Sequence, residues 1–203
     1  MLILILFLAV IATAQTKNKY SYLSQKQFIP VELGKVYLGM SFADFAKQIS
    51  LKNAVIDNRY GWLEAKLPYA KGNVESVIFK VYGLEEEDYT KLIHKVTRPG
   101  KTENGDEYEE EVQMIDPAKI PVKGIVYEVS LHYKKGFDLK SQAMKMFGAA
   151  GDVYKKGDPS HIFDIQWTKK TTDGLTWLIR YYKETNSIML AGVIDKTEWD
   201  PAA

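Results

Sequence analysis

Three histidines are the side chains best suited to metal binding or proton transfer, and they lie far apart at His94, His132 and His161. His94 follows two apolar residues, and His132 alternates with apolar residues of an expected strand. Histidines in such settings are usually surface or strand-face side chains. A metal site would have to combine one of them with carboxylates from distant segments. We therefore expect no metal site.

The acidic string from Asp106 to Glu111 could offer several oxygen ligands to Ca²⁺. It lacks the alternating ligands and the glycine at the sixth position that define an EF-hand loop. We interpret the string as a solvated loop.

Covalent and cofactor chemistry has no recognisable motif. The chain contains no cysteine, which excludes thiol nucleophiles, thiolate zinc sites and disulfides. There is no G-x-S-x-G and no glycine-rich nucleotide motif, and Ser160 and His161 are only sequence neighbours. Carboxylates are abundant without informative spacing. We expect no catalytic residue and no cofactor, with an envelope hydrolase using carboxylate side chains as the alternative.

Aromatic residues on expected strands are the remaining candidates for function. Trp167 shares a strand face with Phe163 and Ile165, and Trp177 shares one with Leu175, Ile179 and Tyr181, which indicates core rows. The opposite row of the middle strand places arginine beside tyrosine, a combination typical of partner-binding surfaces. The candidate binding residues are Arg180, Tyr182, Leu178, Tyr60 and Trp62.

Charge limits the class of partner. The 27 basic residues nearly cancel the 26 acidic ones, so no strong field favours nucleic acid. We expect a protein, peptide or cell-wall component as the partner.

The first fourteen residues have the layout of a secretory signal peptide. An apolar run from Leu2 to Ile11 is followed by Ala12-Thr13-Ala14 and then by polar residues. The run is shorter than the roughly 20 residues that a spanning helix needs. It predicts cleavage after Ala14, a periplasmic or secreted location and no stable membrane anchor after cleavage. A retained anchor and an ordinary buried segment are the alternatives.

Helix signals stand out at two places. Ser41 is a suitable N-cap for a helix with Phe42, Phe45, Ala46 and Ile49 on one face. Asp138 is an N-cap for a second, with Leu139, Ala143, Met146 and Phe147 as its apolar face and Gly148 after its end. A further helix is expected over 84–96, behind an acidic first turn.

Strand patterns account for much of the remainder. We expect strands over 60–67, 74–82 and 125–133, and a meander of three strands over 162–167, 175–182 and 187–194. A turn is expected over 68–73, and Asp173-Gly174 and Thr185-Asn186 are expected to form the turns of the meander.

The predicted fold class is therefore α+β, with an antiparallel sheet packed by two or three helices. We divide the chain into a signal peptide (1–14), an N-terminal arm (15–34), a first half (35–98), an acidic linker (99–111) and a second half (112–203). Asn104-Gly105 could close a hairpin, but the charge density favours the linker. Two similar helix-plus-meander halves remain an open possibility.

The segment from Val36 to Phe45, with its Gly-Met-Ser sequence before a short helix, resembles the opening of small bacterial envelope modules. These are of the β-lactamase-inhibitor-like and outer-membrane-assembly small lipoprotein type, and Met146-Phe147-Gly148 is similar to their helix end. This chain lacks their lipid-attachment and paired cysteines. The resemblance implies a helix packed on an antiparallel sheet and a binding role. We expect an exported noncatalytic binding or interaction module of the bacterial envelope; an assembly or stability factor without a small-molecule site is a further possibility.

Overall fold

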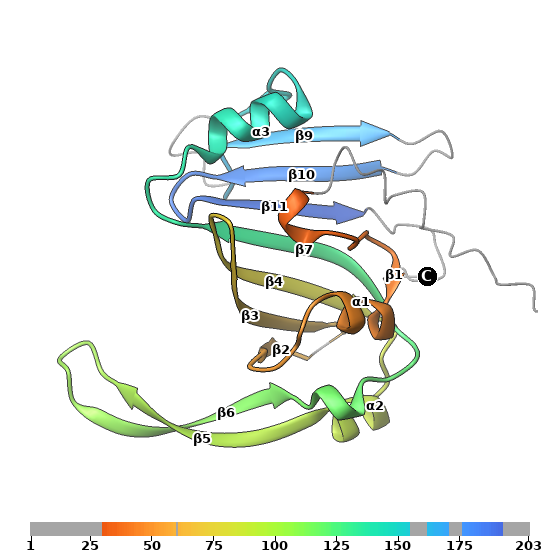
Figure 1. Ribbon diagram of the computed structural model, residues 1–203, viewed down its shortest axis with the longest axis vertical. Helices are drawn as coiled ribbons and strands as arrows, with labels where there is room; N and C mark the ends of the chain where they lie inside the picture. The colour runs from red at the N-terminus through yellow and green to blue at the C-terminus, as the bar shows by residue number, and fades with distance from the viewer. Residues whose placement is uncertain (1–29, 60, 155–161, 171–175, 193–203) are drawn as a thin grey trace, which may run out of the picture.

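The computed structural model describes residues 30–192 except 60, 155–161 and 171–175. Within these residues, eleven strands form one antiparallel sheet that does not close into a barrel (Figure 1). The spatial order is β5-β6-β2-β3-β4-β7-β11-β10-β9-β8, and β1 pairs with β7 outside this path. The strands are β1 (Met40–Ser41), β2 (Val55–Asn58), β3 (Leu63–Lys71), β4 (Val74–Tyr82), β5 (Ile93–Lys101), β6 (Glu107–Ile115), β7 (Ile125–Tyr133), β8 (Asp152–Val153), β9 (Ile165–Lys170), β10 (Thr176–Tyr182) and β11 (Ser187–Gly192).

The first predicted helix is confirmed as α1 (Phe42–Gln48). The Ser41 hydroxyl accepts the Asp44 N–H at 3.1 Å and donates to the Asp44 carboxylate at 2.9 Å. Phe42 and Phe45 are buried, with ring centroids 6.1 and 4.9 Å from that of Phe79 on β4. A local cap and an apolar stripe therefore suffice to place α1 on the sheet.

The second predicted helix is confirmed as α3 (Leu139–Phe147), which begins after Asp138 and ends at Gly148 with a φ of 90°. Leu139, Ala143 and Phe147 are buried as predicted, but Met146 is 39% exposed and does not belong to the buried face. The Asp138 carboxylate accepts the Ser141 N–H at 3.1 Å. Phe147 packs against Trp167, with ring centroids 5.5 Å apart. Lys169 donates to the Phe147 carbonyl at 2.7 Å, which satisfies a free carbonyl at the negative end of the helix.

Both helices lie on the same face of the sheet, which we call the helical face. A continuous row of cross-strand neighbours runs along it, and every member is at most 2% exposed: Trp167, Ile179, Leu190, Val129, Phe79 and Ala65. Trp177 and Tyr181 are buried in the same core, as their alternation predicts, whereas Leu175 of the predicted row lies outside the described residues.

Phe163 departs from the predicted core row. Its ring lies under the Arg180 guanidinium and beside Tyr182, both on the opposite face. Phe163 precedes the first residue of β9, so the strict alternation of a strand does not apply to it.

A close backbone approach fixes the start of α1 against the sheet. The Phe42 N–H donates to the Gly124 carbonyl at 2.9 Å. A Cβ atom on Gly124 would lie 2.8 Å from the Leu84 side chain and 3.2 Å from the Tyr82 carbonyl, and the φ of Gly124 is +93°. Only glycine meets both conditions without a shift of the neighbouring strand.

The region between the predicted halves differs from expectation. Helix α2 (Glu86–Leu92) is shorter than the predicted 84–96, and the chain then extends as β5. Strands β5 and β6 form a hairpin, so the predicted linker over 99–111 is wrong. Ion pairs across the hairpin compensate the acidic string: Lys95 with Glu111, Arg98 with Glu110, and Lys101 with Glu107. The predicted turn over 68–73 is also shorter, because β3 continues to Lys71.

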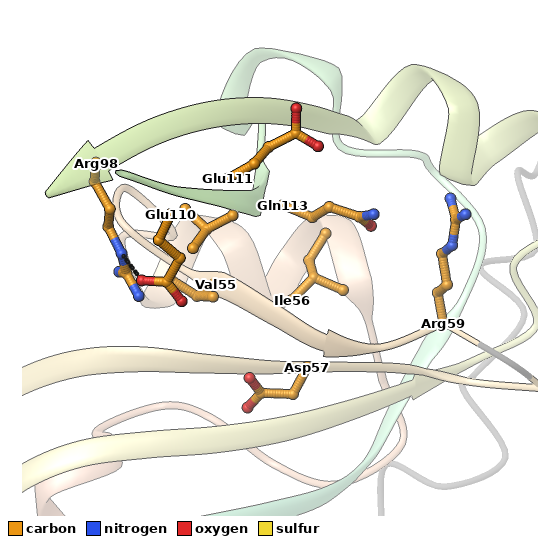
Figure 2. Close-up of a pocket in the computed structure, with 9 residues that line it drawn as sticks. Val55, Ile56, Asp57, Arg59, Arg98, Glu110, Glu111 and Gln113 are labelled. Atoms are coloured by element: carbon orange, nitrogen blue, oxygen red, sulfur yellow. Dashed lines mark hydrogen bonds and ion pairs between the residues drawn. The ribbon is translucent and has the colours of Figure 1, made fainter. Parts of the chain in front are cut away.

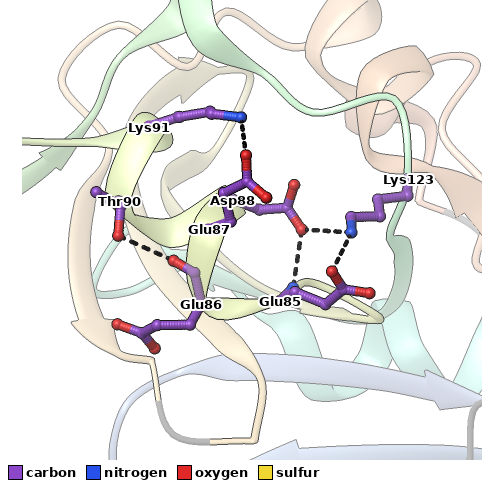
Figure 3. A network of polar contacts seen from close by, with 7 residues as sticks. All are labelled: Glu85, Glu86, Glu87, Asp88, Thr90, Lys91 and Lys123. Carbon is purple, nitrogen blue, oxygen red and sulfur yellow. Dashed lines mark hydrogen bonds and ion pairs between the residues drawn. The ribbon is translucent and has the colours of Figure 1, made fainter.

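A polar network anchors the start of α2 (Figure 3). The Glu85 N–H donates to the Asp88 carboxylate at 2.8 Å, and Lys123 bridges the Glu85 and Asp88 carboxylates at 2.9 and 3.0 Å. Lys91 forms a second ion pair with Glu87. Lys123 follows the short 3-10 helix Pro117–Lys119, so the network ties α2 to the segment that leads into β7.

The two helix-plus-meander units approach β7 from opposite sides. Strands β2-β3-β4 end beside one edge of β7 and β9-β10-β11 end beside the other, with β4 and β11 both antiparallel to β7. To superpose one meander on the other strand for strand, it must be turned over, which would carry its helix to the opposite face of the sheet. In the structure, however, α1 and α3 lie on the same face. The likeness of the two units is therefore confined to the order of their elements and does not extend to their handedness.

The described helices can be compared with the requirements of a membrane-spanning helix. None of them combines the length and the apolar character that crossing a bilayer requires.

Candidate functional site

The predicted binding residues gather on the face opposite α1 and α3, which we call the helix-free face. Leu178, Arg180 and Tyr182 alternate along β10 on this face and are half-buried. Trp62, which immediately precedes β3, makes an edge-on contact with Tyr82 of β4, with ring centroids 6.1 Å apart. Tyr60 lies outside the described residues.

A row of charged side chains crosses this face between the predicted residues. Glu64 on β3, Lys80 on β4 and Glu128 on β7 are successive cross-strand neighbours. The Lys80 ammonium lies 2.9 Å from the Glu128 carboxylate and 3.5 Å from that of Glu64. The Glu128 side chain is only 14% exposed. These three residues form a partly desolvated ionic row.

Burial alters the acidity of this row. Burial raises the pKa of the Glu128 carboxyl above its usual range, even though the Lys80 ammonium opposes the shift. Burial alone would lower the pKa of Lys80, but the charge and hydrogen bond of Glu128, together with Glu64, raise it. The ammonium is thereby held in its charged form between the two carboxylates.

A β-bulge adds a tyrosine to the row. Lys80 pairs with Glu128 and the next residue, Val81, pairs with Val126, so Tyr127 is the extra residue of β7. Its ring stacks on Tyr82, with centroids 4.0 Å apart. The Lys80 ammonium also lies 5.8 Å from the centroid of the Trp62 ring. The bulge therefore brings a tyrosine pair against the ionic row.

Arg180 on β10 lies on the other side of β11 from the ionic row. Its Nε donates to the Gln166 side-chain oxygen at 2.8 Å, and its guanidinium lies 4.5 Å from the Phe163 ring centroid. Its charge acts on Glu128 across the intervening strand β11. Two carboxylates and two cations thus share one face with no net charge.

The floor between these groups is formed by β11. On the helix-free face this strand presents small or flexible side chains that are at most 8% exposed: Ser187, Met189 and Ala191. The Tyr182 hydroxyl lies 3.7 Å from the Met189 sulfur. Longer side chains from β7 and β10 stand on either side of this floor. The site is therefore held by strands that pair with β11 on both sides.

The residues suggested for metal binding are not brought together. His94 is exposed, and His132 is half-buried on the helix-free face, where burial and the Lys66 charge lower its pKa. No group of three potential metal ligands occurs in the described part of the chain. His161 and Ser160 fall among the residues that the structure does not describe.

Sequence reasoning missed Glu64, Lys80, Glu128 and Tyr127. The three charged residues carry one usable signal, because each occupies a polar position in an otherwise apolar strand pattern. Their meeting depends on strand order, and the position of Tyr127 depends on the bulge, neither of which is visible in the sequence.

The comparisons with known proteins give no family for this chain. It matches no protein-family model, and neither the curated proteins nor the solved structures contain a significant match.

Proposed function

We propose that this protein is an exported, noncatalytic binding module of the bacterial envelope that contacts its partner through the helix-free face. One observation carries the proposal: Trp62, Leu178, Arg180 and Tyr182 lie on the same face around a partly desolvated ionic row. Arginine, tyrosine and tryptophan with restricted mobility are the residues that contribute most at binding surfaces.

The charge balance of the site favours binding over catalysis. Lys80 contacts both carboxylates of the row, and Arg180 is held by Gln166 and by Phe163. Such mutual pairing orders the side chains before a partner arrives and so lowers the entropy cost of binding. The absence of net charge on these four ionic groups suits a protein, peptide or cell-wall component better than a polyanion.

Site-specific photo-crosslinking tests the proposal. A benzoylphenylalanine at Leu178, on the helix-free face, is expected to form a discrete adduct in the intact envelope of the producing cell. The variant Arg180→Ala in the same chain is expected to weaken the adduct about tenfold, since loss of a central arginine typically costs 1 kcal/mol or more.

The matched control is the same probe at Val122, an apolar residue that is 87% exposed in the segment before β7. It is expected to give no discrete adduct. Equal adducts at both positions, or an adduct that is indifferent to Arg180→Ala, would contradict the proposal.

An envelope hydrolase is the second candidate, because Glu128 has a raised pKa and lies close enough to Glu64 for their charges to interact. A carboxyl group with a raised pKa beside a second carboxylate is a known device for acid–base catalysis. The two candidates differ in the fate of the captured partner. A hydrolase would release it cleaved and leave it intact in Glu128→Gln, whereas a binding module leaves it intact in both.

The proposed location rests on the signal-peptide pattern of residues 1–14. N-terminal sequencing of the protein purified from the periplasm or the medium is expected to begin at Gln15. Recovery with Met1 intact would contradict cleavage.

A further inference from the structure

The continuity of the sheet breaks between β2 and β6. The two strands pair only at Val55 with Met114, next to a hydrogen bond from the Ile115 N–H to the Ala54 carbonyl at 3.1 Å. From Val55 the chain of β2 continues forward to Asn58 past a bulge. From Met114 the chain of β6 is followed backward to Glu107. The edge of β2 that faces β6 and the edge of β6 that faces β2 pair with no other strand within the described residues.

The backbone of β6 presents hydrogen-bonding groups to this gap. Outward-pointing N–H groups recur at every second residue of a strand. Because the Ile115 N–H points toward β2, the N–H groups of Gln113 and Glu111 point the same way. The alternate residues of β6 face β5, with which β6 is paired over its whole length.

The opposite edge of the hairpin is protected, whereas this one is not. By the same alternation, the outer edge of β5 carries Thr97 and Pro99, and proline has no N–H to offer another strand. Cross-strand ion pairs hold the hairpin, and the Tyr108 ring covers Gly100, where a Cβ would lie 2.6 Å from it. Among the described strands, the edge of β6 is therefore ordered in advance and unpaired, as a ligand strand would require.

A cavity of about 470 Å³ occupies the gap (Figure 2). A strand residue fills roughly 160 Å³, from a rise of about 3.3 Å, a strand spacing of about 4.8 Å and a sheet spacing of about 10 Å. The cavity is therefore large enough for a short segment of an added strand. Val55, Ile56 and Val112 give it apolar walls.

Charge at one end of the cavity indicates the chemistry of the occupant. Figure 2 shows the Arg98–Glu110 ion pair at one end and Arg59 at the other. Of the charged side chains that line the cavity, Arg98 is neutralised by Glu110 at 3.1 Å and Glu111 by Lys95 at 2.7 Å. Within the described residues, neither Arg59 nor Asp57 forms an ion pair. An acidic side chain on the occupant would pair with Arg59 at its end of the cavity, provided that it lies away from Asp57.

We propose that the gap between β2 and β6 binds an extended peptide segment of a partner protein, which adds to the edge of β6 as a strand and places an acidic side chain against Arg59. Main-chain hydrogen bonds supply the affinity in such strand addition, and the flanking side chains supply the specificity. This site is separate from the residues of the proposed function and does not depend on them.

A random heptapeptide library displayed on phage, selected against the full-length protein, tests the proposal. Selected peptides are expected to contain an acidic residue and to protect the amides of Glu111 and Gln113 from hydrogen exchange. The variant Glu111→Pro removes one donor from the gap and leaves the bonds to β5 in place. It is expected to weaken a selected peptide about tenfold, as loss of one main-chain hydrogen bond implies.

Two control variants isolate this effect. Glu111→Ala loses the same ion pair to Lys95 but keeps the N–H, and Thr97→Pro places a proline directly opposite, on the outer edge of the hairpin. Both are expected to bind the peptide as the wild type does. An absence of binders, equal binding to Glu111→Pro, or peptides whose affinity depends on Arg180 instead would overturn the proposal. The last result would still support a binding role for the helix-free face.

Discussion

Lys80 illustrates how a single residue depends on groups that are distant in sequence. It stands between Glu64 and Glu128, which belong to strands on either side of its own. Removing one member of a partly buried ion pair leaves an uncompensated charge, and that penalty exceeds the net value of the pair. The ionic row is therefore sensitive to the loss of its central cation.

We predict that Lys80→Met lowers the free energy of unfolding by about 2 kcal/mol at pH 7, less than for a fully buried pair because the side chains keep some exposure. Without the ammonium, the pKa of Glu128 rises further above its unfolded value. The folded state then protonates Glu128 at a higher pH than the unfolded state does. The loss of unfolding free energy in Lys80→Met is therefore expected to shrink as the pH falls from 7 toward 5.

Guanidinium unfolding at both pH values measures this effect. The double variant Lys80→Met/Glu128→Gln is expected to lose the pH dependence of the deficit. Lys66→Met, an exposed lysine on the neighbouring strand, is the control and is expected to stay within about 0.5 kcal/mol of the wild type. A deficit in Lys80→Met that is the same at both pH values would contradict this account.

At the scale of elements, local signals predicted α1 and α3 well. Their caps, Ser41 and Asp138, satisfy backbone N–H groups within the same four residues, so no distant contact is needed to recognise them. Strands β4 and β7 were also predicted with their observed bounds, because most of their residues alternate between buried and partly exposed positions. The bulge at Tyr127 interrupts this alternation in β7 and was not predicted.

The β5–β6 hairpin shows where local reasoning failed. Six acidic residues over 103–111 resemble a solvated linker when counted along the chain. In the hairpin, three of them face basic residues on the other strand, and Tyr108 covers a glycine opposite it. The partners lie 6 to 16 residues away, so a short sequence window cannot detect the compensation.

At the scale of the whole molecule, the sheet joins both halves into one core. Val129 on the central strand β7 lies between Phe79 of the first meander and Leu190 of the second. All three are at most 1% exposed. A substitution that removes packing at Val129 is therefore expected to weaken both meanders.

We predict that Val129→Ala lowers the free energy of unfolding by about 2 kcal/mol, through lost burial and the cavity left behind. Native-state hydrogen exchange is expected to accelerate by the same factor at Phe79 and at Ile179, which lie in different meanders. Acceleration confined to one meander would show that the halves unfold separately.

The sequence by itself determined the capped helices, the alternating strands, the burial of Trp167 and Trp177, and the outward row of Leu178, Arg180 and Tyr182. These features depend on residues within a few positions of one another. Only the tertiary structure decided the strand order, the hairpin in place of a linker, the opposite handedness of the two units and the ionic row of Glu64, Lys80 and Glu128. Each of these depends on which strands become neighbours, and that is set by the packing of one shared core.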